Sequence, residues 1–142
     1  MDIKSTVQKL SKKYKTNDPF KLASELDILI VYENLGNILG YFDAHFRMRT
    51  IHINENAPEE LKGFICAHEL GHAILHAKVN TPFLSAYTLY SVGKIERQAN
   101  TFAVELLLPD EVILENSTLS LYDLSHAANI PKGMECLKHF RR

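Results

Sequence analysis

Two histidines four residues apart, with a glutamate next to the first, place the strongest constraint on how this sequence can fold. His68 and His72, with Glu69, stand in the string HELGH, which matches the H-E-x-x-H metal motif. Apolar side chains recur at helical spacing through residues 58–78, and residues four apart on a helix share one face. Both imidazoles can therefore reach one Zn²⁺ at about 2.0–2.1 Å, with Glu69 beside the open coordination position. The motif predicts a metal-binding helix and a carboxylate placed to act on water.

A catalytic zinc site normally has three protein ligands and one open position, so a third ligand has to come from elsewhere. Residues 94–108 form a second predicted helix that stops at Pro109. Glu96 shares one face of this helix with Ala99 and Ala103, whose small size allows two helices to approach closely. Glu96 is the predicted ligand; the alternative is an exposed first-turn glutamate that interacts with the helix dipole.

Other polar residues near these helices are weaker candidates. Glu105 is the second choice as third ligand, but its place well round the helix from Glu96 predicts exposure to solvent. Asn100, one turn after Glu96, is a candidate to hydrogen-bond a ligand or the first helix. The sequence leaves open which residue stabilises an oxyanion or supports a ligand from behind, and three candidates lie nearby: His76, Tyr87 and Tyr90.

Length and charge bound the class of protein. A chain of 142 residues predicts one domain, 1–142, in which residues 1–109 form the core and 110–142 a helical extension. Because 16 Lys and Arg nearly balance 17 Asp and Glu, no global basic field exists to drive direct nucleic-acid binding, and none is expected. No segment approaches the roughly 20 apolar residues that span a bilayer, and the first residues do not have the pattern of a signal peptide. We therefore expect a cytoplasmic protein without membrane contact.

Hydrophobic spacing predicts an α+β fold. Residues 3–14 and 19–26 are expected to be helices, the second with Asp18 as its N-cap. Three apolar, β-branched runs between residues 27 and 54 predict a small three-stranded antiparallel sheet. The third run is expected at an edge, where a substrate peptide could pair with Thr50 to Asn54. Short C-terminal helices are predicted at 110–115, 119–128 and 132–140.

Residues 121–140 show a faint helix-turn-helix pattern, with a lysine-bearing helix predicted after a turn at Pro131. This pattern leaves open a DNA-binding regulator, which would bind DNA tightly and in a salt-sensitive manner. A solvated charged face is the simpler explanation of the basic C-terminus.

The two predicted zinc helices together resemble the ImmA/IrrE-type zinc metallopeptidases. The resemblance lies in HELGH at 68–72, ERQANTFA at 96–103 and LLLP at 106–109. It implies a zincin-like fold with N-terminal helices, a small sheet and two zinc-site helices. It also implies one Zn²⁺ per chain, held by His68, His72 and Glu96, with Glu69 as the general base.

The same resemblance implies a function. Members of this family act inside the cell and inactivate helix-turn-helix repressors by cleavage, so such a repressor is the expected substrate. Its cleavage would relieve repression of a phage, a mobile element or a stress regulon. The alternative is a binding protein that antagonises the repressor without hydrolysis and holds its zinc ion for structure alone.

Overall fold

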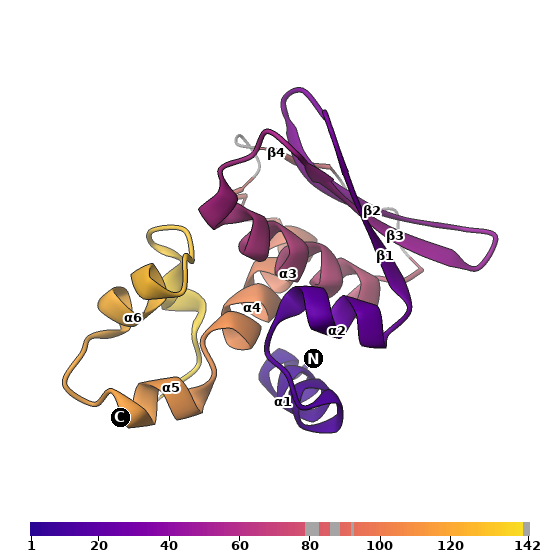
Figure 1. The fold of residues 1–142 in the computed structure, drawn as a ribbon. Helices are drawn as coiled ribbons and strands as arrows, with labels where there is room; N and C mark the ends of the chain where they lie inside the picture. The colour runs from indigo at the N-terminus through magenta and orange to yellow at the C-terminus, as the bar shows by residue number, and fades with distance from the viewer. Residues whose placement is uncertain (79–82, 86–88, 92, 141–142) are drawn as a thin grey trace.

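Two helices, α3 and α4, run against each other at the centre of the molecule (Figure 1). The computed structural model describes residues 1–78, 83–85, 89–91 and 93–140. In chain order the elements are α1 (Ile3–Tyr14), α2 (Pro19–Glu25), β1 (Ile28–Glu33), β2 (Ile38–His45), β3 (Met48–Asn54), α3 (Glu59–Leu75), β4 (Leu84–Ser85), α4 (Lys94–Leu107), α5 (Asp110–Glu115), α6 (Leu121–Ala127) and the 3₁₀ helix η1 (Met134–Leu137). The predicted α+β class and the two central helices are confirmed.

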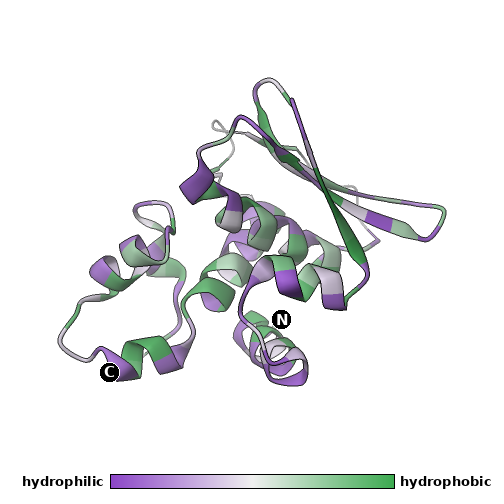
Figure 2. Ribbon diagram, in the orientation of Figure 1, coloured by the Kyte–Doolittle hydropathy of each residue, from purple (hydrophilic) through white to green (hydrophobic). Residues whose placement is uncertain are grey.

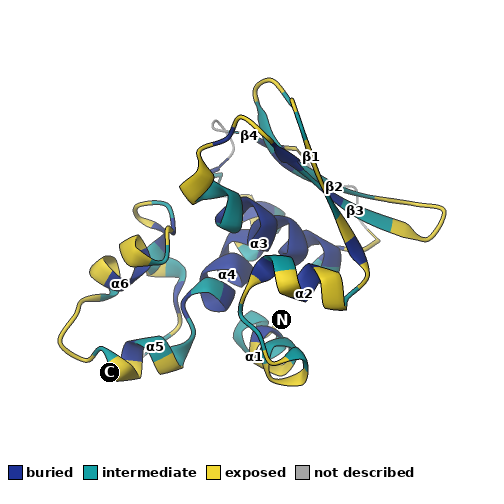
Figure 3. Cartoon of the chain, in the orientation of Figure 1, coloured by how far each residue is buried: buried dark blue, intermediate teal, exposed yellow. Residues whose placement is uncertain are grey.

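The two central helices approach closely because the residues between them are small. A Cβ atom added to Gly71 on α3 would lie 3.1 Å from Cβ of Phe102 and 3.2 Å from Cα of Ala99, both on α4. Glycine at position 71 therefore lets the backbone of α3 lie directly against α4. Both helices are buried along most of their length (Figure 3).

The sheet differs from the predicted three-stranded antiparallel sheet. It has four strands in the order β1-β3-β2-β4, and β1 pairs with β3 in parallel, while β2 pairs antiparallel with β3 and β4. Neighbouring strands lie about 4.8 Å apart, and β1 and β2 are separated by two such spacings. Residues 34–37 extend up to about 3.5 Å each, so they are long enough to connect the two strands. The hairpin formed by β2 and β3 then places β3 between β1 and β2.

The interior position of β3 corrects a second expectation. Thr50 to Asn54 was predicted as an edge that could pair with a substrate, but β3 is hydrogen-bonded on both sides. Its side chains explain this position. Ile51 and Ile53 are fully buried on the helix side of the sheet. On the other face the two ring nitrogens of His52 contact Glu33 of β1 at 2.5 Å and Asp43 of β2 at 2.7 Å.

Gly40 allows the sheet to rest on α3. A Cβ atom there would lie 2.6 Å from Cγ2 of Ile65 and 2.8 Å from the carbonyl oxygen of His52, closer than such atoms come in proteins. The same atom would lie 3.9 Å from Cγ of Glu69. Strand β2 therefore covers the part of α3 that carries the metal motif.

The N-terminal helices form as their sequences predict. Asp2 caps α1 by accepting a hydrogen bond from the Ser5 amide, and Asp18 caps α2 by accepting one from the Phe20 amide. Helix α1 is hydrophilic and exposed on the side turned away from the rest of the molecule (Figures 2 and 3). Among the described residues, no helix combines the length and apolar character needed to cross a membrane.

The C-terminal segment is less helical than predicted. Residues 132–140 contain only the 3₁₀ turn η1, because Pro131 lacks an amide donor and Gly133 takes a φ of +93°. The second helix of the suggested helix-turn-helix is therefore absent from residues 121–140. Helix α6 and η1 pack together, and η1 also contacts α4. The division of the chain at residue 109 stays a prediction.

The two glycines at the sheet and on α3 make a matched test of this packing. Gly40→Ala should destabilise the fold by about 1–3 kcal/mol, because the added methyl group meets backbone and a buried side chain. Gly63→Ala, at a position in α3 with open space around it, should instead stabilise by about 0.5–1 kcal/mol. Urea unfolding measures both values. Wild-type stability of the Gly40→Ala variant would contradict the described contact between β2 and α3.

Candidate metal centre

Three buried side chains meet where the first turn of α4 crosses the middle of α3. His68 and His72 lie one turn apart on α3, and Glu96 reaches them from α4. One ligand-type atom from each residue lies within 4.8 Å of the other two. Nε2 of His72 is 2.8 Å from Oε1 of Glu96, and Nε2 of His68 is 3.4 Å from Oε2. The structure thus brings the three predicted ligands together.

The local sequence accounts for this meeting. The i, i+4 spacing places both imidazoles on the face of α3 that is turned toward α4. Gly71 lies between them on the chain, and its contact with Ala99 holds the two helix backbones close. Glu96 precedes Ala99 by three residues, so it stands on the same face of α4, one turn nearer the start of the helix.

The ligand-type atoms are short of hydrogen-bond partners. Among the described residues, Nε2 of His68, Nε2 of His72 and both oxygens of Glu96 are buried without a hydrogen bond of acceptable geometry. Buried polar atoms are nearly always paired, and these four ligand-type atoms converge on one another, an arrangement typical of a metal site. Two imidazole nitrogens and a carboxylate are a normal ligand set for zinc, and these residues fit a metal ion.

Glu69 lies beside this cluster and is fully buried, with neither of its oxygens hydrogen-bonded among the described residues. Burial raises the pKa of its carboxyl to about 7, and the nearby Glu96 charge also raises it. The opposite holds for Glu96: burial alone would raise its pKa, but the two imidazoles outweigh burial and lower it to about 2. The site therefore contains one carboxylate that stays charged and one whose proton is readily exchanged near neutral pH.

The Nδ1 atoms of the two histidines each contact a further polar side chain. Nδ1 of His68 lies 2.7 Å from Oδ1 of Asn100, whose Nδ2 donates to the Leu89 carbonyl at 3.0 Å. Nδ1 of His72 lies 2.9 Å from Nδ1 of His76. The structure thus places Asn100 and His76, two of the predicted supporting residues, against the two histidines.

Sequence reasoning missed Gln98, whose Oε1 lies 2.8 Å from Nε2 of His76. Residues two apart on a helix are rotated by about 200°, so spacing puts Gln98 on a different face of α4 from Glu96. The contact arises because His76 lies just past the end of α3, within hydrogen-bond distance of Gln98 on α4. A histidine one turn after His72 that needs a hydrogen-bond acceptor is the only signal the sequence carried.

The structure describes one of the two tyrosine candidates. The hydroxyl of Tyr90 donates to the Lys132 carbonyl at 2.9 Å, so it is bound to the C-terminal segment. Tyr87 lies outside the described residues, and its role as an oxyanion stabiliser stays a prediction.

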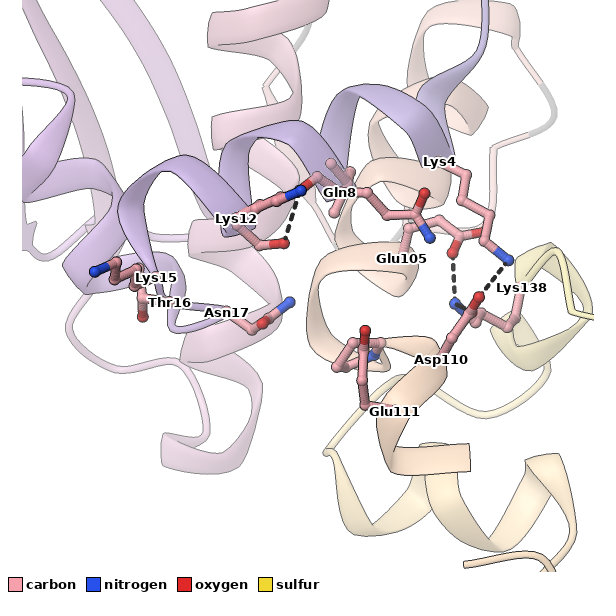
Figure 4. Close-up of a pocket in the computed structure, with 13 residues that line it drawn as sticks. Lys4, Gln8, Lys12, Lys15, Thr16, Asn17, Glu105, Asp110, Glu111 and Lys138 are labelled. Carbon is pink, nitrogen blue, oxygen red and sulfur yellow. Dashed lines mark hydrogen bonds and ion pairs between the residues drawn. The ribbon is translucent and has the colours of Figure 1, made fainter. Parts of the chain in front are cut away.

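Glu105 was expected to be exposed, and this expectation is wrong. It is 3% exposed and forms an ion pair of 2.6 Å with the equally buried Lys138, whose ammonium group also contacts Asp110 at 2.8 Å. Asp110 in turn pairs with Lys4 of α1 (Figure 4). The C-terminal segment folds back over the end of α4 and supplies the partner that the helix pattern could not reveal. Glu105 lies nine residues beyond Glu96, about 13 Å along α4, and is not a ligand.

Comparison with known proteins agrees with this geometry. Residues 23–139 match the IrrE N-terminal-like domain, a peptidase family. The chain belongs to this family. The chain is 45% identical over 139 residues to the "Uncharacterized immunity region protein 2" of Bacillus phage phi105, covering 96% of this chain and 88% of the phage protein. It is also 36% identical over 115 residues to "Metallopeptidase ImmA" of Bacillus subtilis (strain 168), covering 80% of this chain and 67% of that protein.

Removal of the Asn100 amide tests whether its contact with His68 supports metal binding. Asn100→Ala should weaken zinc binding about 10–100-fold, because the imidazole loses the contact that fixes its orientation. Competition with a chromophoric chelator measures the affinity. Asn116→Ala removes a similar amide contact, to the Val112 carbonyl at 2.8 Å, and serves as the control with unchanged affinity. Equal affinities of the two variants would contradict the supporting role of Asn100.

Proposed function

We propose that this chain is a zinc-dependent endopeptidase that cleaves a helix-turn-helix transcriptional repressor. Cleavage would relieve repression of a phage, a mobile element or a stress regulon. The observation that carries the proposal is the buried group of His68, His72 and Glu96, with the unpaired carboxylate of Glu69 next to it. Membership of a peptidase family supports the same reaction class.

In this proposal His68, His72 and Glu96 hold the metal. A zinc ion bound there would act as a Lewis acid that lowers the pKa of a water molecule to about 7 and polarises the scissile carbonyl group. Glu96 contributes a carboxylate oxygen, and the positive charge of a bound metal ion would keep this carboxylate ionised. The two imidazoles contribute neutral nitrogen ligands, with Asn100 and His76 orienting them.

Glu69 is proposed as the general base. Its carboxylate accepts a proton from the attacking water and then delivers that proton to the amine of the leaving peptide. The interior around Glu69 suits this exchange, because burial raises the carboxyl pKa to about 7 and so lowers the cost of protonation. Strand β2, packed over α3 at Gly40, contributes to this burial.

The same carboxylate favours hydrolysis over simple binding. A structural zinc site is closed by four ligands and needs no further ionisable group beside it. A fully buried carboxylate without a hydrogen bond is costly, and such groups persist where chemistry uses them. The non-catalytic antagonist therefore explains less of the site than the peptidase does.

The relatives support the proposed setting. One is named a metallopeptidase and the other an immunity region protein of a phage, names that agree with a peptidase acting in a phage setting. A transcriptional repressor as substrate places the proposed reaction in the cytoplasm. The repressor is a protein partner of this chain, and the proposal includes no direct contact with DNA.

Glu69→Gln separates the peptidase from the antagonist. The variant should keep its zinc and lose cleavage by about 10²–10⁴-fold, because an amide cannot take the proton from water. The assay follows cleavage and promoter activity in cells that coexpress the helix-turn-helix repressor of the same genetic element. Glu60→Gln, in the exposed first turn of α3, is the control and should cleave normally. Relief of repression by the Glu69→Gln variant without any cleavage would instead establish the antagonist.

A further inference from the structure

The structure links His72 to an amide on α4 in two steps. Nδ1 of His72 meets Nδ1 of His76 at 2.9 Å, and Nε2 of His76 meets Oε1 of Gln98 at 2.8 Å. We propose that Gln98 is a positioning residue, which acts through His76 to fix the proton of His72 on Nδ1 and leaves Nε2 free for the metal ion. This inference rests on the proposed metal centre.

The contact between His76 and Gln98 determines where the protons of both histidines lie. An amide oxygen can only accept a hydrogen bond, so His76 must carry its proton on Nε2 to donate to Gln98. A neutral imidazole carries one proton, so Nδ1 of His76 is then an acceptor. Nδ1 of His72 must therefore be the donor in the contact between the two rings. The remaining nitrogen of His72, Nε2, has a free lone pair and points at Glu96.

Metal binding by His72 requires the same proton positions. A histidine can bind a metal ion through Nε2 only when the proton stands on Nδ1, and that proton needs an acceptor. His76 is 6% exposed and offers the acceptor only if its own proton is on Nε2. Gln98 supplies the partner for that proton. Without Gln98, His76 could hold its proton on Nδ1 and oppose metal binding by His72.

The contact of His68 shows the one-step version of the same arrangement. Asn100 accepts directly from Nδ1 of His68, and its own orientation is fixed because Nδ2 donates to the Leu89 carbonyl. The contacts of both histidines thus lead to a side-chain amide on α4, the helix that also carries Glu96. For His72 the path to the amide of α4 includes one more ring, that of His76.

Three variants test whether position 98 acts as an acceptor. Gln98→Met keeps the length of the side chain but removes the amide oxygen, and should weaken zinc binding about 10-fold or more. Gln98→Glu restores an acceptor and should return the affinity to near the wild-type value. Gln8→Met, on an exposed part of α1, should leave the affinity unchanged. Competition with a chelator gives the affinities without any measurement of peptidase activity.

A second measurement reads the proton directly. Nitrogen-15 NMR of the zinc-loaded wild-type protein should place the His76 proton on Nε2, a result that a merely space-filling role of Gln98 would not require. A proton on Nδ1 of His76, or wild-type zinc affinity in the Gln98→Met variant, would overturn the inference and leave the proposed peptidase standing. A wild-type protein that binds no zinc would overturn the proposed metal centre and this inference together.

Discussion

The packing of α3 against α4 encloses four ionisable side chains in an interior that solvent barely reaches, and the rest of the structure is arranged around that enclosure. His68, His72 and Glu69 are fully buried on α3, and Glu96 faces them from α4. Burying such groups without partners costs several kcal/mol each, more than ordinary packing at one helix contact supplies. A metal ion bound to three of them would change this balance, because it would replace the lost solvation with direct bonds. The small residues Gly71 and Ala99 are then necessary, since a wider helix spacing would separate Glu96 from the imidazoles.

Helix α4 is held at both of its ends by charged groups. Its first turn carries Glu96 at the metal centre, and its last turn carries Glu105, buried against Lys138. The backbone amide of His139 also donates to Glu105, and Lys4 of α1 bonds to the His139 carbonyl. The C-terminal segment therefore fixes the direction of α4 and, through α4, the place of Glu96.

Local spacing predicted those parts of the protein that depend on local geometry. The i, i+4 histidines, the helix that bears them and the Asp18 cap follow from rules that act within one or two turns. Glu96 could be predicted as well, because small residues on its face indicated a close helix contact. The sheet order could not, since apolar alternation gives the faces of a strand but not its neighbours. Glu105 and Gln98 were misjudged or missed for a related reason: their partners, Lys138 and His76, reach them from segments that no helical period connects to α4.

X-ray absorption at the zinc edge, combined with elemental analysis, tests most directly whether His68, His72 and Glu96 bind a metal ion. Protein purified without chelator should contain close to one zinc per chain, with nitrogen and oxygen ligands at about 2.0–2.2 Å, and the His72→Ala variant should lose the metal. Wild-type protein without zinc, or zinc that the His72→Ala variant keeps with an unchanged spectrum, would contradict the assignment of this centre.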